Sequence, residues 1–368
     1  MARRPALSVQ ELAWLTRDPP RDPQDQRVPW VLSDRAVDEV RWTQPVEHLD
    51  LTLEQVEFSA TQWDDAVFRR CRFVAVSFTR MTFARARFED VVFERCRFEE
   101  STLNACELLR CRFDACEFEF LTALTSKLHQ CTLERLAAKV FDLRECDLSG
   151  TRFVEAKLEG LRASKVSAET LELRGGTLVG GDLTACRVRT LQSIGVAIEG
   201  LRILDSKFDR FVLSSARIHD VSLAGSEASV LAFVDCPELH GLRVLESTIG
   251  ELRIETCAAV PGLLVADTEV ASVILRDSVF YDAAFERVEA GPGSRMLGGG
   301  LTGVLFEGGT WASFEVSNAA LAEYVALLGA HFESLRFSAM QVSDPYAMRL
   351  EGESYGPGSM TWSDARGA

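Results

Sequence analysis

The sequence lacks the features that mark membrane proteins and several common classes of enzyme. No window approaches the roughly 18 uninterrupted apolar residues that a membrane span needs. The N-terminal residues are not the apolar stretch of a signal peptide, so we expect a soluble, cytoplasmic protein. The glycine-rich segment 291–300 has no Lys-Ser/Thr ending, and no Gly-x-Ser-x-Gly elbow occurs. The phosphate-loop and α/β-hydrolase signatures are therefore missing.

Histidine is scarce, and its placement predicts no metal or catalytic site. The five histidines share no ligand spacing with each other or with a carboxylate cluster. They are His48, His129, His219, His240 and His331. We therefore expect a protein that is not an enzyme and that needs no cofactor or metal.

One bulky apolar residue recurs at every fifth position between residues 51 and 235. The series begins at Leu53 and keeps its phase to Phe233; 36 of its 37 positions are apolar, and Ser193 is the polar one. Five is neither the strand period of 2 nor the helix period of about 3.6. A strict short period over this length is typical of a repeat architecture.

Each five-residue unit predicts a short strand followed by a bend. If the bulky residue is called i, position i−2 is small or apolar, as at Cys96, and i+2 is often charged, as at Arg85 and Glu100. In an extended chain, i−2 and i point to the same side. The next inward pair returns at i+3 and i+5, so each unit needs a corner that restores the phase. The chain must then wind around an axis.

This motif resembles that of the pentapeptide repeat family, in which a small and a polar residue precede Leu or Phe, and two polar or small residues follow. Segments 86–90 (Ala-Arg-Phe-Glu-Asp), 96–100 (Cys-Arg-Phe-Glu-Glu) and 146–150 (Cys-Asp-Leu-Ser-Gly) carry the pattern. The resemblance covers about half of the chain continuously. It implies an all-β fold, the right-handed quadrilateral β-helix, with four units or 20 residues per coil.

The ten cysteines all fall at the inward i−2 position, which a small, buried thiol fits. Cys96 and Cys116 would stack one coil apart, close enough for a disulfide. A reducing cytoplasm nevertheless favours free structural thiols. A zinc site at Cys106, Cys111 and Cys116 is not expected, because these residues lie on successive sides of one coil and do not converge.

Residues 1–50 show no five-residue phase and predict an N-terminal arm and cap that is partly extended. Ser8–Thr16 has the capping pattern of a short helix. Segment 30–32 (Trp-Val-Leu) is expected to cover the open first coil, because exposed sheet ends need covering. An arm that binds a partner is the alternative. The regular β-helix is predicted for residues 51–235.

A less regular, acidic continuation of the β-helix is predicted for residues 236–345. The phase slips by one residue at Pro237, which cannot donate to a strand ladder. The expected bulky series there is Leu239, Val244, Ile249, Ile254, Leu264, Ile274 and Val279. In that phase the inward i−2 positions include Asp267, Asp277 and Asp282, which indicates either an irregular coil or a wrong register.

Three further features are predicted beyond residue 285. Glycine and proline predict a loop at 286–300. Segment 319–328 has helical spacing, but one more β coil is the rival interpretation, and the return of Phe332 and Phe337 favours the coil. Residues 346–368 are expected to form a C-terminal tail. A third phase is expected at Leu301, Phe306, Trp311 and Val316.

The net charge of −15 is concentrated in the C-terminal third. Residues 236–368 hold 18 acids and 8 bases, a balance of −10, whereas residues 51–235 hold 28 acids and 25 bases, a balance of −3. Such a surface repels nucleic acid and attracts a basic protein surface. A role in solubility alone is the alternative.

Outward residues 20 apart should stack into columns, and two of these columns are acidic. Glu94, Asp114 and Glu134 form one, and Glu99 and Glu119 form the next. We take these five residues as the candidate acidic interaction surface. Arginines on alternate rungs, at Arg72, Arg112 and Arg152, could neutralise it, which would leave a mixed solvated face.

The function that follows is a non-enzymatic protein–protein interaction scaffold built on a rigid acidic rod, with a partner that has a basic surface. The resemblance supplies an alternative, because some pentapeptide repeat proteins mimic duplex DNA, bind DNA gyrase or topoisomerase IV and give resistance to topoisomerase poisons. A homodimer through residues 311–337 is a further expectation. No direct contact with nucleic acid or membrane is expected.

Overall fold

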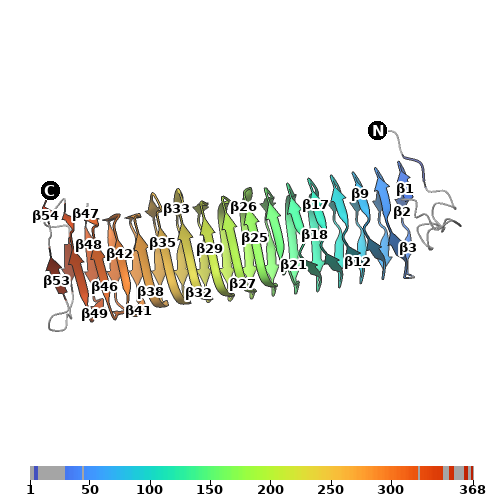
Figure 1. The fold of residues 1–368 in the computed structure, drawn as a ribbon. Coiled ribbons are helices and arrows are strands. Elements are labelled where there is room, and N and C mark those ends of the chain that lie inside the picture. Colours follow the sequence, from blue (N-terminus) through green and yellow to red (C-terminus); the bar gives the residue numbers. More distant parts are fainter. Residues whose placement is uncertain are drawn as a thin grey trace. The chain divides into compact units, whose positions relative to one another are not determined.

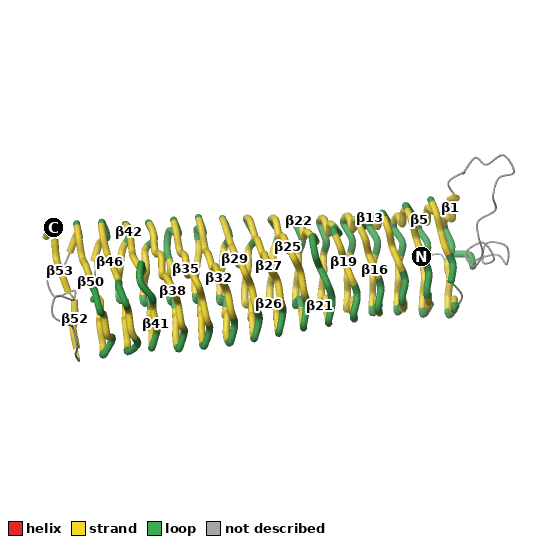
Figure 2. The backbone as a smooth tube through the Cα atoms, turned by 60° about the horizontal axis from the view of Figure 1, so that its bottom comes forward, coloured by secondary structure: helices red, strands yellow, loops and turns green. Residues whose placement is uncertain are grey.

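The computed structural model describes residues 4–6, 30–43, 45–321, 324–342, 348–351, 360–363 and 366–367. Every regular element in these ranges is a β-strand. The chain divides into two compact units, Met1–Asp182 (unit 1) and Leu183–Ala368 (unit 2), each of which is described by itself. Short strands alternate with corners in both units (Figure 2).

The five-residue unit consists of three extended residues, one left-handed corner residue and one linking residue. In a typical unit, Thr82–Ala84 is a strand, and Arg85 follows with a φ of 55°. Corner residues with a φ of about +50° recur every five residues through most of unit 1. The corner turns the chain and returns the next bulky residue to the inward side. This is the bend that an odd period requires.

Hydrogen bonds between coils hold each corner in place. The Arg85 N–H donates to the Asn104 carbonyl of the next coil at 2.8 Å, and the Arg87 N–H donates to the Ala66 carbonyl of the preceding coil at 2.8 Å. The strands are parallel and pair 20 residues apart, so that Phe93 lies between Phe73 and Phe113. The stacked strands are seen in each unit in Figure 1.

Unit 1 holds the first 26 strands, the last of which ends two residues beyond the unit boundary. They are β1 (Trp30–Ser33), β2 (Ala36–Asp38), β3 (Arg41–Trp42), β4 (Glu47–Leu49), β5 (Leu51–Glu54), β6 (Glu57–Ser59), β7 (Gln62–Asp64), β8 (Val67–Arg69), β9 (Arg72–Val74), β10 (Ser77–Thr79), β11 (Thr82–Ala84), β12 (Arg87–Glu89), β13 (Val92–Glu94), β14 (Arg97–Glu99), β15 (Thr102–Asn104), β16 (Glu107–Leu109), β17 (Arg112–Asp114), β18 (Glu117–Leu124), β19 (Lys127–His129), β20 (Thr132–Glu134), β21 (Ala137–Arg144), β22 (Thr151–Val154), β23 (Lys157–Glu159), β24 (Arg162–Ser164), β25 (Ser167–Arg174) and β26 (Thr177–Thr184).

Six strands of unit 2 are eight residues long and run through a corner, and the described residues of this unit form strands β27 to β54. They are β27 (Arg187–Ile194), β28 (Ala197–Leu204), β29 (Lys207–Ser214), β30 (Arg217–His219), β31 (Ser222–Ala224), β32 (Glu227–Val234), β33 (Glu238–His240), β34 (Arg243–Leu245), β35 (Thr248–Glu255), β36 (Val260–Pro261), β37 (Leu264–Ala266), β38 (Glu269–Arg276), β39 (Val279–Tyr281), β40 (Ala284–Glu286), β41 (Glu289–Ala290), β42 (Ser294–Leu297), β43 (Gly300–Thr302), β44 (Val304–Glu307), β45 (Thr310–Trp311), β46 (Phe314–Ser317), β47 (Ala320–Leu321), β48 (Val325–Leu328), β49 (His331–Phe332), β50 (Leu335–Ser338), β51 (Gln341–Val342), β52 (Met348–Glu351), β53 (Met360–Ser363) and β54 (Arg366–Gly367).

Each coil has four faces, which we number in chain order within a unit. In unit 1, face 1 is centred on Phe93, face 2 on Phe98, face 3 on Leu103 and face 4 on Leu108, together with the residues stacked on each. In unit 2 the corresponding centres are Phe233, Leu239, Val244 and Ile249. The predicted all-β quadrilateral β-helix is confirmed.

Stacked aromatic rings fill the first part of unit 1. The ring centroids of Phe73 and Phe93 lie 5.0 Å apart, and those of Phe93 and Phe113 lie 4.5 Å apart with nearly parallel planes. Rings on neighbouring faces meet edge-on, as between Phe83 and Phe88. The void between these rings and the leucines above them measures about 10 Å³. That is the lower limit for a single water molecule, so the interior is a packed core.

Residues 30–43 and 45–49 form a further coil, and the prediction of an arm and cap is wrong for this part of residues 1–50. Leu32 pairs with Leu53, Val37 with Phe58 and Trp42 with Trp63. The offset is 21 residues there and becomes 20 at β4, so one extra residue shifts the phase. Because of this shift, the coil does not follow the five-residue series that begins at Leu53, and the sequence did not predict it. Ala6 pairs with Ala36 on this coil, whereas the helix predicted at Ser8–Thr16 lies outside the described residues.

The register predicted after Ile254 is also wrong, because a second extra residue follows Cys257. Val260, Val265, Leu275 and Phe280 are the buried centres, each exposed by 1% or less. Asp267, Asp277 and Asp282 instead stand at left-handed corners, with φ values of 50°, 45° and 49°. Aspartate tolerates that conformation better than most residues and keeps its carboxylate in solvent. The coil is regular here, and the predicted register was wrong.

The loop at 286–300 and the helix at 319–328 are both replaced by coil. Strands β41, β42 and β43 occupy the glycine-rich segment, and its glycines take the corners, as Gly298 does with a φ of 71°. Strands β47 and β48 occupy the second segment, which confirms the β interpretation for its described residues. The predicted tail at 346–368 contains strands β52, β53 and β54, which pair with preceding coils.

The left-handed corners make Val140 a position of local strain. Its φ is 55°, a conformation in which a β-branched residue is a genuine outlier. We expect Val140→Asn to raise the free energy of unfolding by about 1 kcal/mol, because asparagine accepts this conformation. Val154→Asn is the control, since Val154 lies in the strand β22 and the same change should destabilise there. Denaturant unfolding measures both, and an equal effect of the two substitutions would contradict this account.

Candidate interaction surfaces

The structure places the predicted acidic residues of face 1 in one column. Glu94 pairs in register with Asp114, and Asp114 with Glu134, on strands β13, β17 and β20. All three follow the inward residue of their strand and point outward. The stacking that the sequence predicts is therefore confirmed.

Arginines neutralise that column. Arg72 Nη2 lies 2.5 Å from Glu94 Oε2, and Arg112 Nη2 lies 2.7 Å from Glu134 Oε2. Arg135 pairs with Asp114 and, at 3.0 Å, with Glu134. The hydrogen bond from Arg72 holds the pKa of Glu94 below its usual value. The column is thus a ladder of ion pairs. This corresponds to the alternative in which arginines neutralise the carboxylates and leave a mixed solvated face.

The second predicted column shares a single arginine. Glu99 and Glu119 stack on face 2, and Arg97 Nη2 lies 3.4 Å from Glu99 and 2.8 Å from Glu119. Two carboxylates against one guanidinium leave this column weakly acidic. It gives a cationic partner less charge to bind than the sequence alone indicates.

Corners of unit 1 carry the same alternation of charge. Arg70 makes two hydrogen bonds to Asp50, at 2.8 and 2.9 Å, and Arg110 makes two to Asp90, at 2.7 and 2.9 Å. The hydrogen bonds from Arg110 lower the pKa of Asp90. Such exposed pairs contribute little to stability individually. They do give much of the surface of unit 1 a balanced charge.

An acidic groove, which the sequence analysis missed, lies in unit 2. Its volume is about 440 Å³, and it opens along the corner between faces 3 and 4. Its lining residues are Glu246, Ser247, Thr248, Asp267, Thr268, Glu269, Arg287 and Glu289. Only the corrected register brings these residues together, because Thr248 pairs with Glu269 and Glu269 with Glu289 on successive coils.

The groove keeps most of its negative charge. Asp267 accepts two hydrogen bonds from Arg287, at 2.6 and 2.7 Å, which lower the pKa of the aspartate. Within the described part of the chain, no cation forms an ion pair with Glu246, Glu269 or Glu289. The groove therefore has a net charge of about −3 and differs from the ladders of unit 1.

The described histidines do not assemble a site. His219 Nε2 lies 3.2 Å from Glu238, and the rings of His219 and His240 are 4.9 Å apart on the surface. His48 is buried and stacks on Phe68, at a core position of the unpredicted first coil. Among the residues that the structure describes, no three His, Cys, Asp or Glu side chains could hold a metal ion.

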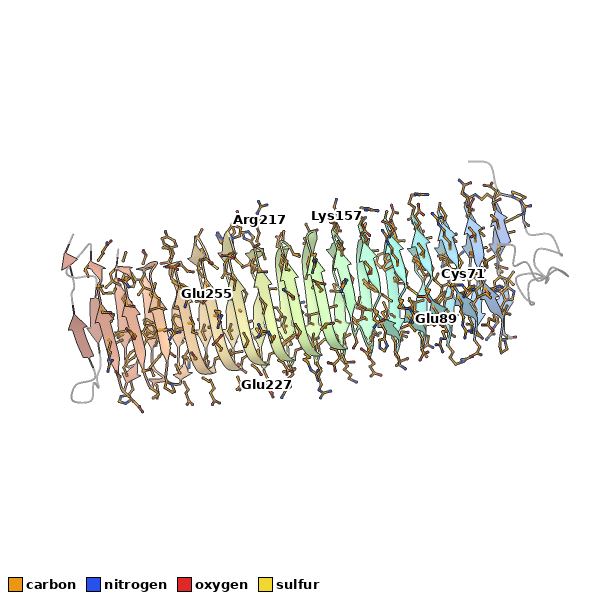
Figure 3. The ribbon with its side chains drawn as sticks, viewed as in Figure 1. Cys71, Glu89, Lys157, Arg217, Glu227 and Glu255 are labelled. Carbon is orange, nitrogen blue, oxygen red and sulfur yellow. The ribbon has the colours of Figure 1, made fainter. Side chains whose placement is uncertain are left out.

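All ten cysteines are free and buried. Cys96 Sγ donates to the Phe73 carbonyl at 3.2 Å, and the other thiols make similar contacts. Burial raises the pKa of Cys71 to about 11 and that of Cys106 to about 12. Cys71 lies among the strands, whereas Lys157 points outward (Figure 3). The prediction of structural free thiols is confirmed.

The large inward aromatic residues between Trp311 and Phe337 do not form the surface expected of a dimer interface. Trp311, Phe332 and Phe337 are inward residues with exposures of 0%, 0% and 3%. Strand β53 pairs with β50 and adds a further coil beyond them. Dimerisation remains a prediction. Within the described ranges, no helix has the length and apolarity needed to cross a membrane.

Comparisons with known proteins give distant structural likenesses alone. No family model matches the sequence, and no curated protein matches it. The pentapeptide repeat protein HetL of Nostoc sp. strain PCC 7120, involved in regulating heterocyst differentiation, shares 15% identity over 60% of this chain and 84% of its own, with a TM-score of 0.24. QnrB1, a plasmid-mediated fluoroquinolone resistance protein, shares 15% identity over 52% of this chain and 93% of its own, with a TM-score of 0.23. The fold assignment therefore rests on this chain's own strand register.

The burial of the thiols predicts that they are chemically silent in the folded protein. At pH 8 we expect fewer than about one thiol per chain to react with Ellman's reagent, because all ten side chains are buried and covered by the packed coils. All ten should react after unfolding in guanidinium. Arg95→Cys is the positive control, since that exposed corner should react at once. Rapid reaction of several native cysteines would contradict the structural role.

Proposed function

We propose that this β-solenoid is a non-enzymatic scaffold for protein–protein interaction, and that a partner with a basic surface binds the acidic groove of unit 2. The contrast between interior and surface supports this proposal. The interior void of unit 1 measures about 10 Å³, whereas the groove measures about 440 Å³ and is open to solvent. A filled core offers no enclosed pocket of the kind that enzymes use.

Repulsion between neighbouring carboxylates in the groove favours the binding of a cation. Glu269 and Glu289 pair in register, so their backbones lie roughly 5 Å apart. Like charges at that separation repel by about 1 kcal/mol in water. A lysine or arginine from a partner would replace this repulsion with attraction. The same partner would gain less at Glu94 or Glu134, where arginines already occupy the carboxylates.

Mimicry of duplex DNA is the second candidate, and the density of charge favours it less. Unit 2 holds 24 acids and 14 bases, a balance of −10, over roughly nine coils. At about 4.8 Å per coil this unit is about 43 Å long, a length over which duplex DNA carries about 25 negative charges. A supercoiling assay with DNA gyrase tests the alternative. If micromolar protein neither inhibits gyrase nor protects it from a poison, mimicry of duplex DNA is excluded.

Affinity capture at two salt concentrations tests the scaffold and its groove. The full chain should retain a basic partner at low salt and lose most of it at about 0.5 M salt, because screening weakens exposed charge contacts. The triple variant Glu246→Gln, Glu269→Gln, Glu289→Gln should lose the partner. The matched control is Glu94→Gln, Asp114→Asn, Glu134→Gln on unit 1, which should retain it.

Cross-linking with mass spectrometry then locates the contact. Cross-links from the captured protein should fall on strands that border the groove, namely β35 and β38. Equal capture by the wild type and the groove variant, with cross-links on unit 1, would refute the groove as the interface. Failure to capture any protein under both salt conditions would count against the scaffold itself.

A further inference from the structure

Face 3 of unit 2 carries a partly exposed apolar stripe that the fold does not need. In each strand of this face the central residue points inward, as Val244, Val265 and Phe285 do with exposures of 1% or less. The residues on either side point outward. Over five successive coils most of these outward residues are leucine or alanine. They are Leu245, Leu264, Ala266, Ala284, Leu305, Ala326 and Leu328, which we call the Leu–Ala stripe.

Large and small residues alternate along the stripe. Leu264 pairs in register with Ala284, Ala284 with Leu305 and Leu305 with Ala326. The leucines are half-buried, whereas Ala266 and Ala326 are buried with an exposure of 5% each. At about 4.8 Å per coil, ridges and hollows each repeat at about 9.6 Å. The face is therefore corrugated and able to interdigitate with a second apolar surface.

The equivalent face of unit 1 is mostly polar. Its outward positions include Thr82, Thr102 and Thr122 before the inward residue, and Asp64 and Asn104 after it, with Ala84 and Leu124 as apolar exceptions. Both faces belong to coils with fully buried interiors, so packing of the coil does not require outward leucines. An apolar surface without a packing role is typical of a binding site.

Carboxylates border the stripe along one side. Glu286 and Glu307 continue the row of Leu245 and Ala266. Glu246, at the adjoining corner, opens the acidic groove. Glu286 has one distant cation, Arg287, at 3.9 Å, and within the described ranges Glu307 has no ion pair. The surface thus combines an apolar floor with an acidic edge.

We propose that the Leu–Ala stripe and its acidic edge bind an amphipathic helix of a partner protein, with lysines or arginines beside its apolar face. This proposal deepens the scaffold function and rests on it. Five coils span about 19 Å, the length of a helix of roughly 13 residues. Every seventh helical residue recurs at about 10.5 Å, which an inclination of roughly 25° reduces to the 9.6 Å period of the hollows.

A second copy of this chain fits the stripe less well. In an antiparallel pair, placing Leu305 of one copy in the hollow at Ala284 of the other puts Glu286 against Glu307 across the interface. Like charges opposed in this way disfavour the pairing. A basic helix meets the same carboxylates with attraction.

Fluorescence anisotropy of the full chain with a designed helix tests this inference. The probe is a hydrocarbon-stapled, fluorescein-labelled peptide of about 14 residues, with leucines on one face and lysines beside them. Leu264→Glu and Leu305→Glu should each weaken its binding at least about tenfold, and Glu307→Lys about fivefold. Thr102→Glu on unit 1 is the matched control and should leave the affinity unchanged.

Three further measurements distinguish the outcomes. Circular dichroism should give equal thermal midpoints for all variants; if Leu305→Glu unfolds, Leu305→Thr replaces it, with a loss in the same direction. Equal binding of a scrambled peptide, or unchanged binding by the leucine variants, would overturn the stripe and leave the groove experiment untouched. A dimer seen by light scattering in the wild type and abolished by Leu305→Glu would assign the stripe to a second copy instead.

Discussion

The left-handed corner is the constraint on which the rest of the structure depends. A strand alternates its side chains with a period of two, so five residues of continuous strand would send successive bulky residues to opposite sides. A corner such as Arg85, with a φ of 55°, removes that mismatch in most of the five-residue repeats, although Thr170, Thr190 and Arg210, inside the long strands β25, β27 and β29, are corner positions without a positive φ. It places one large and one small residue inward, and the core, the columns and the hydrogen bonds between coils follow from it.

This constraint also divides the chain chemically. The inward residues, including all ten cysteines, are committed to packing and lie beyond the reach of ligands. The outward-facing side chains can vary without disturbing the coil. Unit 1 uses them for alternating charges, as in Asp90 and Arg110, whereas unit 2 uses them for the open groove and the Leu–Ala stripe. The outward residues of unit 2 are therefore the ones on which the proposed binding function depends.

The sequence predicts the coils correctly where the five-residue period is constant, and it predicts the wrong register where an extra residue changes that period. The coils from Leu53 to Phe233 follow from counting by fives. The coil at Leu32, Val37 and Trp42 does not, because one extra residue separates it from the main series. A further extra residue lies between Ile254 and Val260, and because the predicted register missed it, the groove residues were assigned to the wrong faces. The ion pairs of Glu94 and Glu134 depend on side-chain reach as well as register, although the columns themselves are legible in the sequence.

Two deletions that differ by one residue test the role of the corner most directly. Removing residues 81–100 takes out one whole coil and joins the corner Arg80 to Ser101, at the start of the next unit. Calorimetry should then show a cooperative transition like that of the wild type. Removing residues 80–100 deletes the corner as well and sends the next bulky residue outward, so the coils that follow should lose their packing and the transition should broaden or disappear. Equal, cooperative unfolding of the two proteins would contradict the account.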